Sequence, residues 1–219
     1  MSVMIAIPCM GTVPIQFVES LLNLQKPEGT KVCFKSSSLI YDARNLLSLT
    51  AIEQGFDYIM WMDSDMTFLP DTIPRLLEDM NHPHIDMVSG LYVKRTFPVK
   101  PVIYQSVRPP VPDENGIPQI HIEEYMNYPR NQMFTIEGCG FGCVMTSVKL
   151  IKAIWDRFGP AFSPYPWAGE DVSFCYRVNQ LLEHDDLYSG HIWCDSRVKC
   201  GHIGQFLFTE DMLKRGDDH

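Results

Sequence analysis

Two carboxylates one residue apart close a strongly apolar run in the first third of the chain. The run follows Asp57 and ends in Asp63-Ser64-Asp65. Such a run predicts a buried strand, and the strand ends of open α/β sheets are where ligands bind. Two acidic groups this close repel unless a cation or donors lie between them, and oxygen ligands suit Mg²⁺ or Mn²⁺. We predict a divalent-cation site here; a solvated turn rich in Asp and Ser is the alternative.

A second acidic pair, Glu170-Asp171, begins a predicted helix after a loop rich in proline and aromatic residues. Acidic residues are common in the first turn of a helix because of its dipole, so the pair alone does not define a site. The loop before it contains Phe162, Tyr165 and Trp167. These rings could stack on sugar faces, although aromatic residues are as often part of a core.

Histidine and cysteine side chains near the C-terminus allow two further interpretations. His202 follows Gly201, and Gly204 lies two residues later, which permits close approach of the backbone. His191, Cys194, Cys200 and His202 together could also form a zinc quartet. Because a strand alternates its faces, His191 and Cys194 would point to opposite sides, so the sequence supports only part of such a site.

The first half of the sequence predicts the elements that position the first acidic pair. Strands and helices alternate, and the order βαβαβαβ predicts a largely parallel sheet with helices on both faces. Asp42 is expected to cap the second helix and Gly55 to end it. The predicted strands cover residues 2–8, 31–35, 57–62 and 85–93, and the predicted helices begin at Pro14, Ala43 and Pro70.

The second half has a different pattern. Residues 108–118 hold four prolines and an Asp-Glu-Asn-Gly turn, which predicts an exposed loop. Three glycines within 138–142 indicate close approach of the backbone to a ligand or another strand. The tail after Glu210 is polar and expected to fray. The remaining predictions are strands at 101–105, 119–124, 133–137 and 143–146, helices at 148–158 and 170–182, and a final hairpin of 191–194 with 197–200.

Length and composition exclude several classes of protein to which this chain could belong. A chain of 219 residues fits one domain, and a formal net charge of −9 argues against general nucleic-acid binding. No apolar run is long enough to span a bilayer, and the N-terminus lacks the basic segment of a signal peptide. Seven cysteines with no CxxC pair indicate reduced thiols. We therefore expect a cytoplasmic protein.

Taken together, four patterns resemble glycosyltransferases of the GT-A fold, which use nucleotide-sugar donors. The resemblance implies an α/β, Rossmann-like fold with a mostly parallel central sheet flanked by helices. It also implies a single catalytic domain over 1–219, with a nucleotide-binding half (1–93), an acceptor-side half (94–209) and a tail (210–219). The patterns are Asp42-Ala43-Arg44-Asn45, Asp63-Ser64-Asp65, Gly169-Glu170-Asp171 and Gly201-His202.

The resemblance assigns donor-side roles. Asp65 would bind Mn²⁺ or Mg²⁺ directly, and Asp63 would reach the ribose or a metal-bound water. His202 would be the third ligand, which favours Mn²⁺. The donor would be a UDP- or GDP-linked sugar. Its other expected contacts are Pro8 along the base and ribose, Arg44 near the diphosphate, Ser64 within the acidic motif, and Lys94, with Arg95, near the phosphates.

On the acceptor side, the resemblance makes Asp171 the general base and Glu170 the ligand of an acceptor hydroxyl, with inversion at the anomeric carbon. The loop at 108–118 would close over the donor. The acceptor is expected to be a glycan or glycoside; a protein side chain, a small molecule and a modified DNA base remain open. Alternatives are a retaining enzyme, a nucleotidyltransferase, and a binding module without catalysis. Cys9-Met10-Gly11-Thr12-Val13 has no basic residue, which argues against the nucleotidyltransferase.

Overall fold

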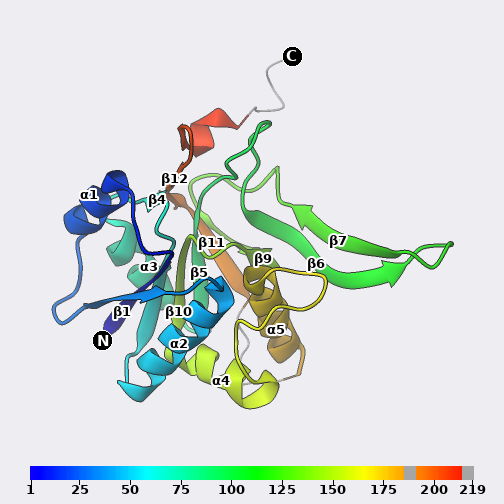
Figure 1. Cartoon of the computed structure of the whole chain (residues 1–219), viewed down its shortest axis with the longest axis horizontal. Helices are drawn as coiled ribbons and strands as arrows, with labels where there is room; N and C mark the ends of the chain where they lie inside the picture. The colour runs from blue at the N-terminus through cyan, green and yellow to red at the C-terminus, as the bar shows by residue number, and fades with distance from the viewer. Residues whose placement is uncertain (185–190, 214–219) are drawn as a thin grey trace.

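The computed structural model describes residues 1–184 and 191–213. Strands and helices alternate in the first half, and strands dominate the second (Figure 1). In chain order the elements are β1 (Val3–Cys9), α1 (Ile15–Asn23), β2 (Lys31–Ser36), α2 (Ile40–Glu53), β3 (Tyr58–Met62), β4 (Met66–Thr67), α3 (Thr72–Met80), β5 (Met87–Leu91), β6 (Ile103–Pro112), β7 (Pro118–Glu124), β8 (Met133–Ile136), β9 (Gly138–Cys139), β10 (Cys143–Ser147), α4 (Val148–Phe158), α5 (Glu170–His184), β11 (Ile192–Lys199), β12 (Gly201–Ile203), β13 (Leu207–Phe208) and the 3₁₀ helix η1 (Glu210–Met212).

A seven-stranded sheet in the order β2-β1-β3-β10-β5-β11-β8 forms the centre of the fold. β1 is parallel to β2 and β3, and β5 is parallel to β11. β10 runs antiparallel between β3 and β5, and β8 runs antiparallel to β11. Five of the seven strands therefore point the same way. The prediction of a mostly parallel α/β sheet is confirmed, with β10 inserted at its centre.

Helices cover both faces of this sheet, as predicted. β3 alternates its side chains between the two hydrophobic clusters: Ile59 and Trp61 face one, and Met60 and Met62 face the other. The first cluster also contains side chains of α2, α4 and α5, and the second contains those of α1 and α3. Burial on both faces explains why this strand is a continuous apolar run.

A small sheet, β13-β12-β4, lies beside the end of β3. β4 follows Asp65 directly, and β12 pairs with it so that His202 lies opposite Met66. A Cβ atom at Gly201 would lie 2.4 Å from Thr67 Oγ1, so only glycine permits this approach. The glycine therefore brings His202 next to the acidic motif.

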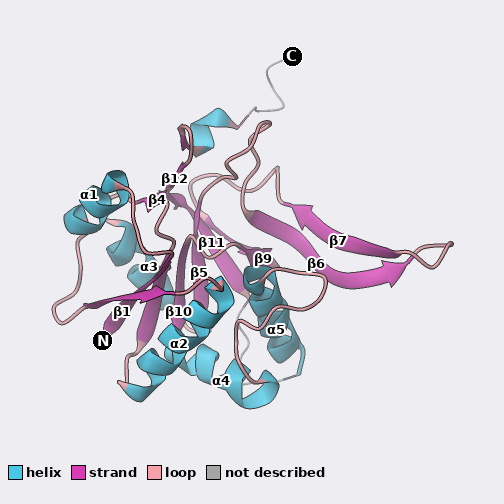
Figure 2. Cartoon of the chain, in the orientation of Figure 1, coloured by secondary structure: helices cyan, strands magenta, loops and turns pink. Residues whose placement is uncertain are grey.

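The segment predicted as a proline-rich loop is instead most of a long β-hairpin. β6 continues to Pro112 and pairs with β7, and the turn lies at 113–117. Prolines are tolerated because β9 pairs only with Ile103 and Tyr104, leaving the outer part of β6 bonded on one side. Figure 2 shows the hairpin projecting from the molecule, on the side away from α1. The structure gives no support for its predicted closure over the donor.

Three other predictions about local structure need correction. The final hairpin is one continuous strand, β11, because Asp195 and Ser196 are buried and hydrogen-bonded rather than forming a turn. α2 begins at Ile40, so Asp42 lies inside the helix and is not its cap. Gly55, with φ +68°, does end that helix. Of the polar tail, Glu210–Met212 form η1, and residues 214–219 lie outside the described residues. No helix in the described ranges could span a membrane.

Candidate active site

A cleft of about 540 Å³ opens at the carboxyl ends of β1 and β3, which is a typical size for a small-ligand site. The ends of β1 and β3, the start of α2, the loop after β5, and β12 all contribute to it. Its lining residues are Pro8, Cys9, Met10, Thr12, Ser37, Ser38, Ile40, Ala43, Asp63, Ser64, Asp65, Arg95 and His202. The predicted donor residues Pro8, Asp63, Ser64, Asp65 and His202 therefore lie together.

Arg44 connects the two acidic motifs from beneath the cleft. Its Nη2 donates to Asp63 Oδ1 at 2.7 Å, and its Nε donates to Glu170 Oε1 at 3.3 Å. These carboxylates are 107 residues apart in sequence, one after β3 and the other at the start of α5. A single guanidinium thus holds the two acidic motifs together.

The side chain of Arg44 is buried, with 1% of its surface exposed. The rings of Trp61, Phe141 and Phe162 surround the guanidinium at 5.3–5.9 Å. Burial lowers the pKa of Arg44, but Asp63 and Glu170 outweigh it, and the pKa is raised overall. The structure therefore places Arg44 beneath the cleft and outside its lining, whereas the resemblance implied a position near the diphosphate.

Asp65 also lines the cleft and has partners other than Arg44. Arg95 Nη1 lies 2.9 Å from Asp65 Oδ2, and His202 Nε2 lies 3.5 Å from the same oxygen. Burial raises the pKa of Asp65, but His202 and Arg95 together hold it below its usual value. Arg95 also donates to the carbonyl of Ile203, which joins the loop after β5 to β12.

The arrangement of His202 suits a metal ligand. Its Nδ1 lies 2.8 Å from the carbonyl oxygen of Val93, so this nitrogen carries the proton and Nε2 presents its lone pair toward Asp65 when the ring is neutral. Within the described ranges, no three His, Cys, Asp or Glu side chains gather closely enough to hold a metal ion alone. Asp65 and His202 could together offer two ligands to a divalent cation, and the oxygens of a diphosphate are of the type that would complete such a site.

Asp171 lies at the start of α5, beside Glu170. Burial is the main cause that raises its pKa to about 6, and the negative charges of Glu170 and Asp63 add to the shift. Its Oδ1 accepts a hydrogen bond from the backbone N–H of Val172 at 2.7 Å, and Arg44 partly offsets the rise. A carboxylate with a pKa near 6 is matched to proton abstraction near neutral pH.

Comparisons with known proteins decide the family. The sequence model described as glycosyl transferase family 2 matches residues 17–155, well over half of the chain. The chain belongs to glycosyl transferase family 2. A comparison with curated protein sequences finds no match.

Solved structures share the fold of this family 2 chain. The crystal structure of A197 from STIV aligns with a TM-score of 0.65 at 17% identity, covering 100% of both chains. GalNAc-T7 in complex with UDP, GalNAc and Mn²⁺ aligns with a TM-score of 0.59 at 12% identity, covering 93% of this chain and 44% of that one. This chain thus spans under half the length of GalNAc-T7. The predicted GT-A fold is confirmed.

Some residues of the family 2 chain lie elsewhere than predicted. Lys94 is not in the cleft lining: its Nζ pairs with Glu124 at 2.9 Å, and it is Arg95 that reaches the cleft. Glu137, directly after β8, pairs with Arg108 of the hairpin. Phe162 is buried in the core rather than available for stacking.

The glycines and the zinc quartet also have structural explanations. A Cβ atom at Gly140 would lie 2.1 Å from the Tyr92 hydroxyl, so this glycine permits packing within the protein rather than approach of a ligand. His191, Cys194, Cys200 and His202 are all described, and no metal-binding cluster is found among the described residues. The interpretation as a structural zinc site is therefore wrong.

Asn45 is a functional-site residue that the sequence did not identify on its own. Its Oδ1 accepts the backbone N–H of Phe162 at 2.9 Å, which fastens the loop before Glu170 onto α2. The available signal was its place in the Asp42-Ala43-Arg44-Asn45 pattern. Arg44 and Asn45 together tie the acceptor-side segment to the donor-side helix.

Proposed function

We propose that this family 2 chain transfers a sugar from a nucleoside-diphosphate sugar to an acceptor hydroxyl, with inversion at the anomeric carbon. One observation carries the proposal: Arg44 joins Asp63 of the donor-side motif to Glu170 of the acceptor-side motif. A pure nucleotide-binding module needs no such link to a second acidic pair. GalNAc-T7, a protein of similar fold, was solved with UDP, GalNAc and Mn²⁺, in keeping with this class of donor.

The donor would lie in the cleft, with its base and ribose along Pro8 and Ala43 and its diphosphate toward Asp65 and Arg95. Asp65 and His202 would hold Mn²⁺ or Mg²⁺. A bound divalent cation would stabilise the negative charge that develops on the departing diphosphate. Arg95 lines the same side of the cleft and is placed to donate to the phosphates.

Asp171 would act as the general base. The attacking hydroxyl gives its proton to the Asp171 carboxylate as its oxygen bonds to the anomeric carbon, while the bond from that carbon to the diphosphate oxygen breaks. Glu170 would accept a hydrogen bond from an acceptor hydroxyl and remain fixed by Arg44. A retaining reaction needs no enzymic base, so the raised pKa of Asp171 favours inversion.

Replacing Asp171 with asparagine tests this function. We expect Asp171→Asn to keep donor affinity within about threefold and to lower the transfer rate by roughly 10²–10⁴-fold, the usual contribution of a general base. UDP- and GDP-sugars would be assayed with Mn²⁺, following release of nucleoside diphosphate and the configuration of the product. Asp156→Asn, an exposed carboxylate on α4, is the matched control.

Two results would count against the proposal. Loss of donor binding in Asp171→Asn would mean that this carboxylate serves the donor rather than the acceptor. An unchanged transfer rate with retained configuration would point to the retaining alternative. Absence of both donor binding and diphosphate release across the panel would remove the transferase function itself.

A further inference from the structure

Four apolar side chains form an exposed patch at one end of the molecule. Phe97 is 69% exposed, Phe206 59%, Leu207 47% and Met212 39%. Phe97 lies in the loop between β5 and β6, Phe206 in the turn between β12 and β13, Leu207 at the start of β13, and Met212 in η1. The ring of Phe208 packs against two of them, with centroids 5.4 Å from Phe97 and 6.3 Å from Phe206. We call these four residues the apical patch.

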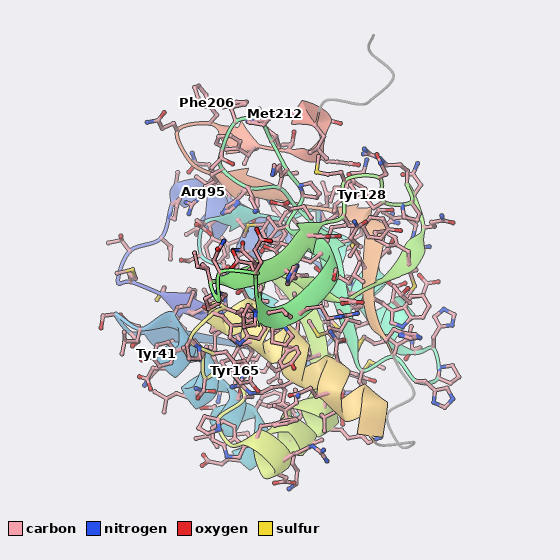
Figure 3. The ribbon with its side chains drawn as sticks, turned by 90° about the vertical axis from the view of Figure 1, so that its right-hand side faces the viewer. Tyr41, Arg95, Tyr128, Tyr165, Phe206 and Met212 are labelled. Carbon is pink, nitrogen blue, oxygen red and sulfur yellow. The ribbon has the colours of Figure 1, made fainter. Side chains whose placement is uncertain are left out.

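The apical patch lies at one end of the molecule. Figure 3 shows Phe206 and Met212 at the top, above Arg95 and far from Tyr165. Figure 1, seen at 90° to it, places η1 and the turn after β12 at the same end. Exposed apolar side chains that gather in this way mark contact surfaces more often than isolated ones do.

Four cations belong to the segments that carry the apical patch or pair with them: two lie in the loop between β5 and β6, and two pair with Glu210 of η1, and each is more exposed than its carboxylate partner. The exposed fractions of the cations are between 37% and 47%, whereas those of the partners are between 5% and 32%. Asp211 is an exposed acidic residue at this end. The cations are Arg95, Lys100, Arg130 and Lys199, and their partners are Asp65, Glu124 and Glu210.

We propose that the apical patch docks the protein on an anionic lipid surface. Aromatic and aliphatic tips would enter the headgroup region, and Lys100, Arg130 and Lys199 would lie against lipid phosphates. Long Arg and Lys side chains can keep their charged ends at such a surface while their stems pack on apolar groups. The overall charge of −9 means that the rest of the protein surface repels anionic lipid. Docking through the apical patch is therefore the favoured orientation.

A second copy of the chain fits the apical patch less well. Across a two-fold axis the same surface meets itself, so the four cations of one copy would face those of the other. The same segments carry Arg95 and His202, which line the cleft. Docking would thus place the cleft beside the membrane and favour an acceptor at the lipid surface, a consequence that rests on the proposed function. The docking itself does not rest on the proposed function.

Vesicle binding tests the proposal without any enzyme assay. The whole chain would be sedimented with vesicles of phosphatidylcholine alone or with an equal share of phosphatidylglycerol. We expect binding to the anionic vesicles only, weakened several-fold by raising salt from 50 to 500 mM. Phe206→Ser with Met212→Ser should lower the binding constant at least tenfold, since two large apolar side chains would no longer bury their surface in the headgroup region.

Matched variants separate the apical patch from general hydrophobicity. Val111→Ser with Ile117→Ser removes two residues, each 57% exposed, from the β6–β7 hairpin and should leave binding unchanged. Lys100→Ala should weaken binding roughly fivefold at low salt. In Phe206→Trp, the fluorescence of the introduced indole should shift to shorter wavelength when anionic vesicles are added.

Three outcomes would overturn the proposal. Wild-type protein that stays in the supernatant with anionic vesicles at 50 mM salt excludes docking. Equal loss of binding in the hairpin control assigns it to another surface. A dimer seen by analytical ultracentrifugation and abolished by Phe206→Ser with Met212→Ser makes the patch an interface between copies. Wild-type protein that binds anionic vesicles but shows no transferase activity would contradict the proposed function and leave the docking proposal unaffected.

Discussion

Asp63 and Asp65, separated by one residue, both line the cleft, yet different partners hold them. Asp63 accepts a hydrogen bond from a buried arginine that also holds the acceptor-side Glu170. Asp65 faces Arg95, which is 47% exposed, and His202. In a continuing strand the two carboxylates would share a face, but the chain turns here, with the N–H of Met66 donating to the carbonyl of Asp63.

The difference separates a fixed carboxylate from an exchangeable one. Asp63 is held by Arg44, whose side chain solvent and ligands do not reach, so we expect its position to be the same with and without donor. Asp65 is held by a flexible, half-exposed side chain that a cation or a diphosphate can displace. One acidic motif would thus combine a structural link with a ligand-binding group.

The largest effect is expected when the two arginines, Arg44 and Arg95, are replaced and compared. Arg44→Met leaves the carboxylates of Asp63 and Glu170 without their buried cation, and we expect a loss of about 3–5 kcal/mol in the free energy of unfolding. Arg95→Met removes a partly exposed pair and should cost less than about 1 kcal/mol. Urea denaturation at pH 7 measures both. Similar losses in the two variants would mean that Asp63 and Asp65 are held in equivalent ways.

Metal binding should distinguish the carboxylates themselves. We expect Asp65→Asn to weaken Mn²⁺ binding in the presence of UDP by roughly 10–100-fold, because a direct ligand is lost. Asp63→Asn should change it by less than about threefold. Titration calorimetry or the electron paramagnetic resonance of free Mn²⁺ gives the constants. The reverse order would assign the direct metal contact to Asp63.

Much of the first half could be predicted because its strands are buried on both faces. β1 and β3 are short apolar runs bounded by polar residues, and each lies within two residues of its predicted range. β6 and β11 were harder to predict from the sequence. The prolines of β6 and the Asp195-Ser196 pair of β11 have the composition of turns, and only tertiary partners keep both segments extended. Local sequence does not contain those partners.

The sequence predicted which residues form the candidate site better than it predicted the contacts between them. Asp63, Asp65 and His202 lie in one cleft, as the ordered motifs indicated. The burial of Arg44 was not predictable, because the face of α2 toward the core also carries Asn45 and Ser48, and such a mixed face gives no apolar stripe. Whether Arg95 or Lys94 reaches the cleft depends on how the chain leaves β5, which one-residue spacing does not determine.

The pH dependence of transfer should report the charge of Asp63. A general base acts when deprotonated, so with Asp171 at a pKa of about 6 the rate should rise about tenfold from pH 5 to pH 7. Because the charge of Asp63 raises this pKa, Asp63→Asn should move the midpoint of the profile to lower pH. Asp65→Asn, assayed at saturating metal, should leave the midpoint in place. A midpoint that moves equally in both variants would show that the two carboxylates act on Asp171 alike.

The smallest expected effect separates two adjacent cations. Arg95 lines the cleft beside Asp65, whereas Lys94 pairs with Glu124 outside it. We expect Arg95→Ala to raise the KM for the donor about fivefold, since a charge-assisted hydrogen bond to a phosphate is lost, with kcat changed less. Lys94→Ala should alter neither by more than about twofold. Steady-state kinetics over a range of donor concentrations, with acceptor and Mn²⁺ saturating, give both constants. An increase of KM in Lys94→Ala alone would mean that the loop after β5 turns its other cation toward the donor when the donor binds.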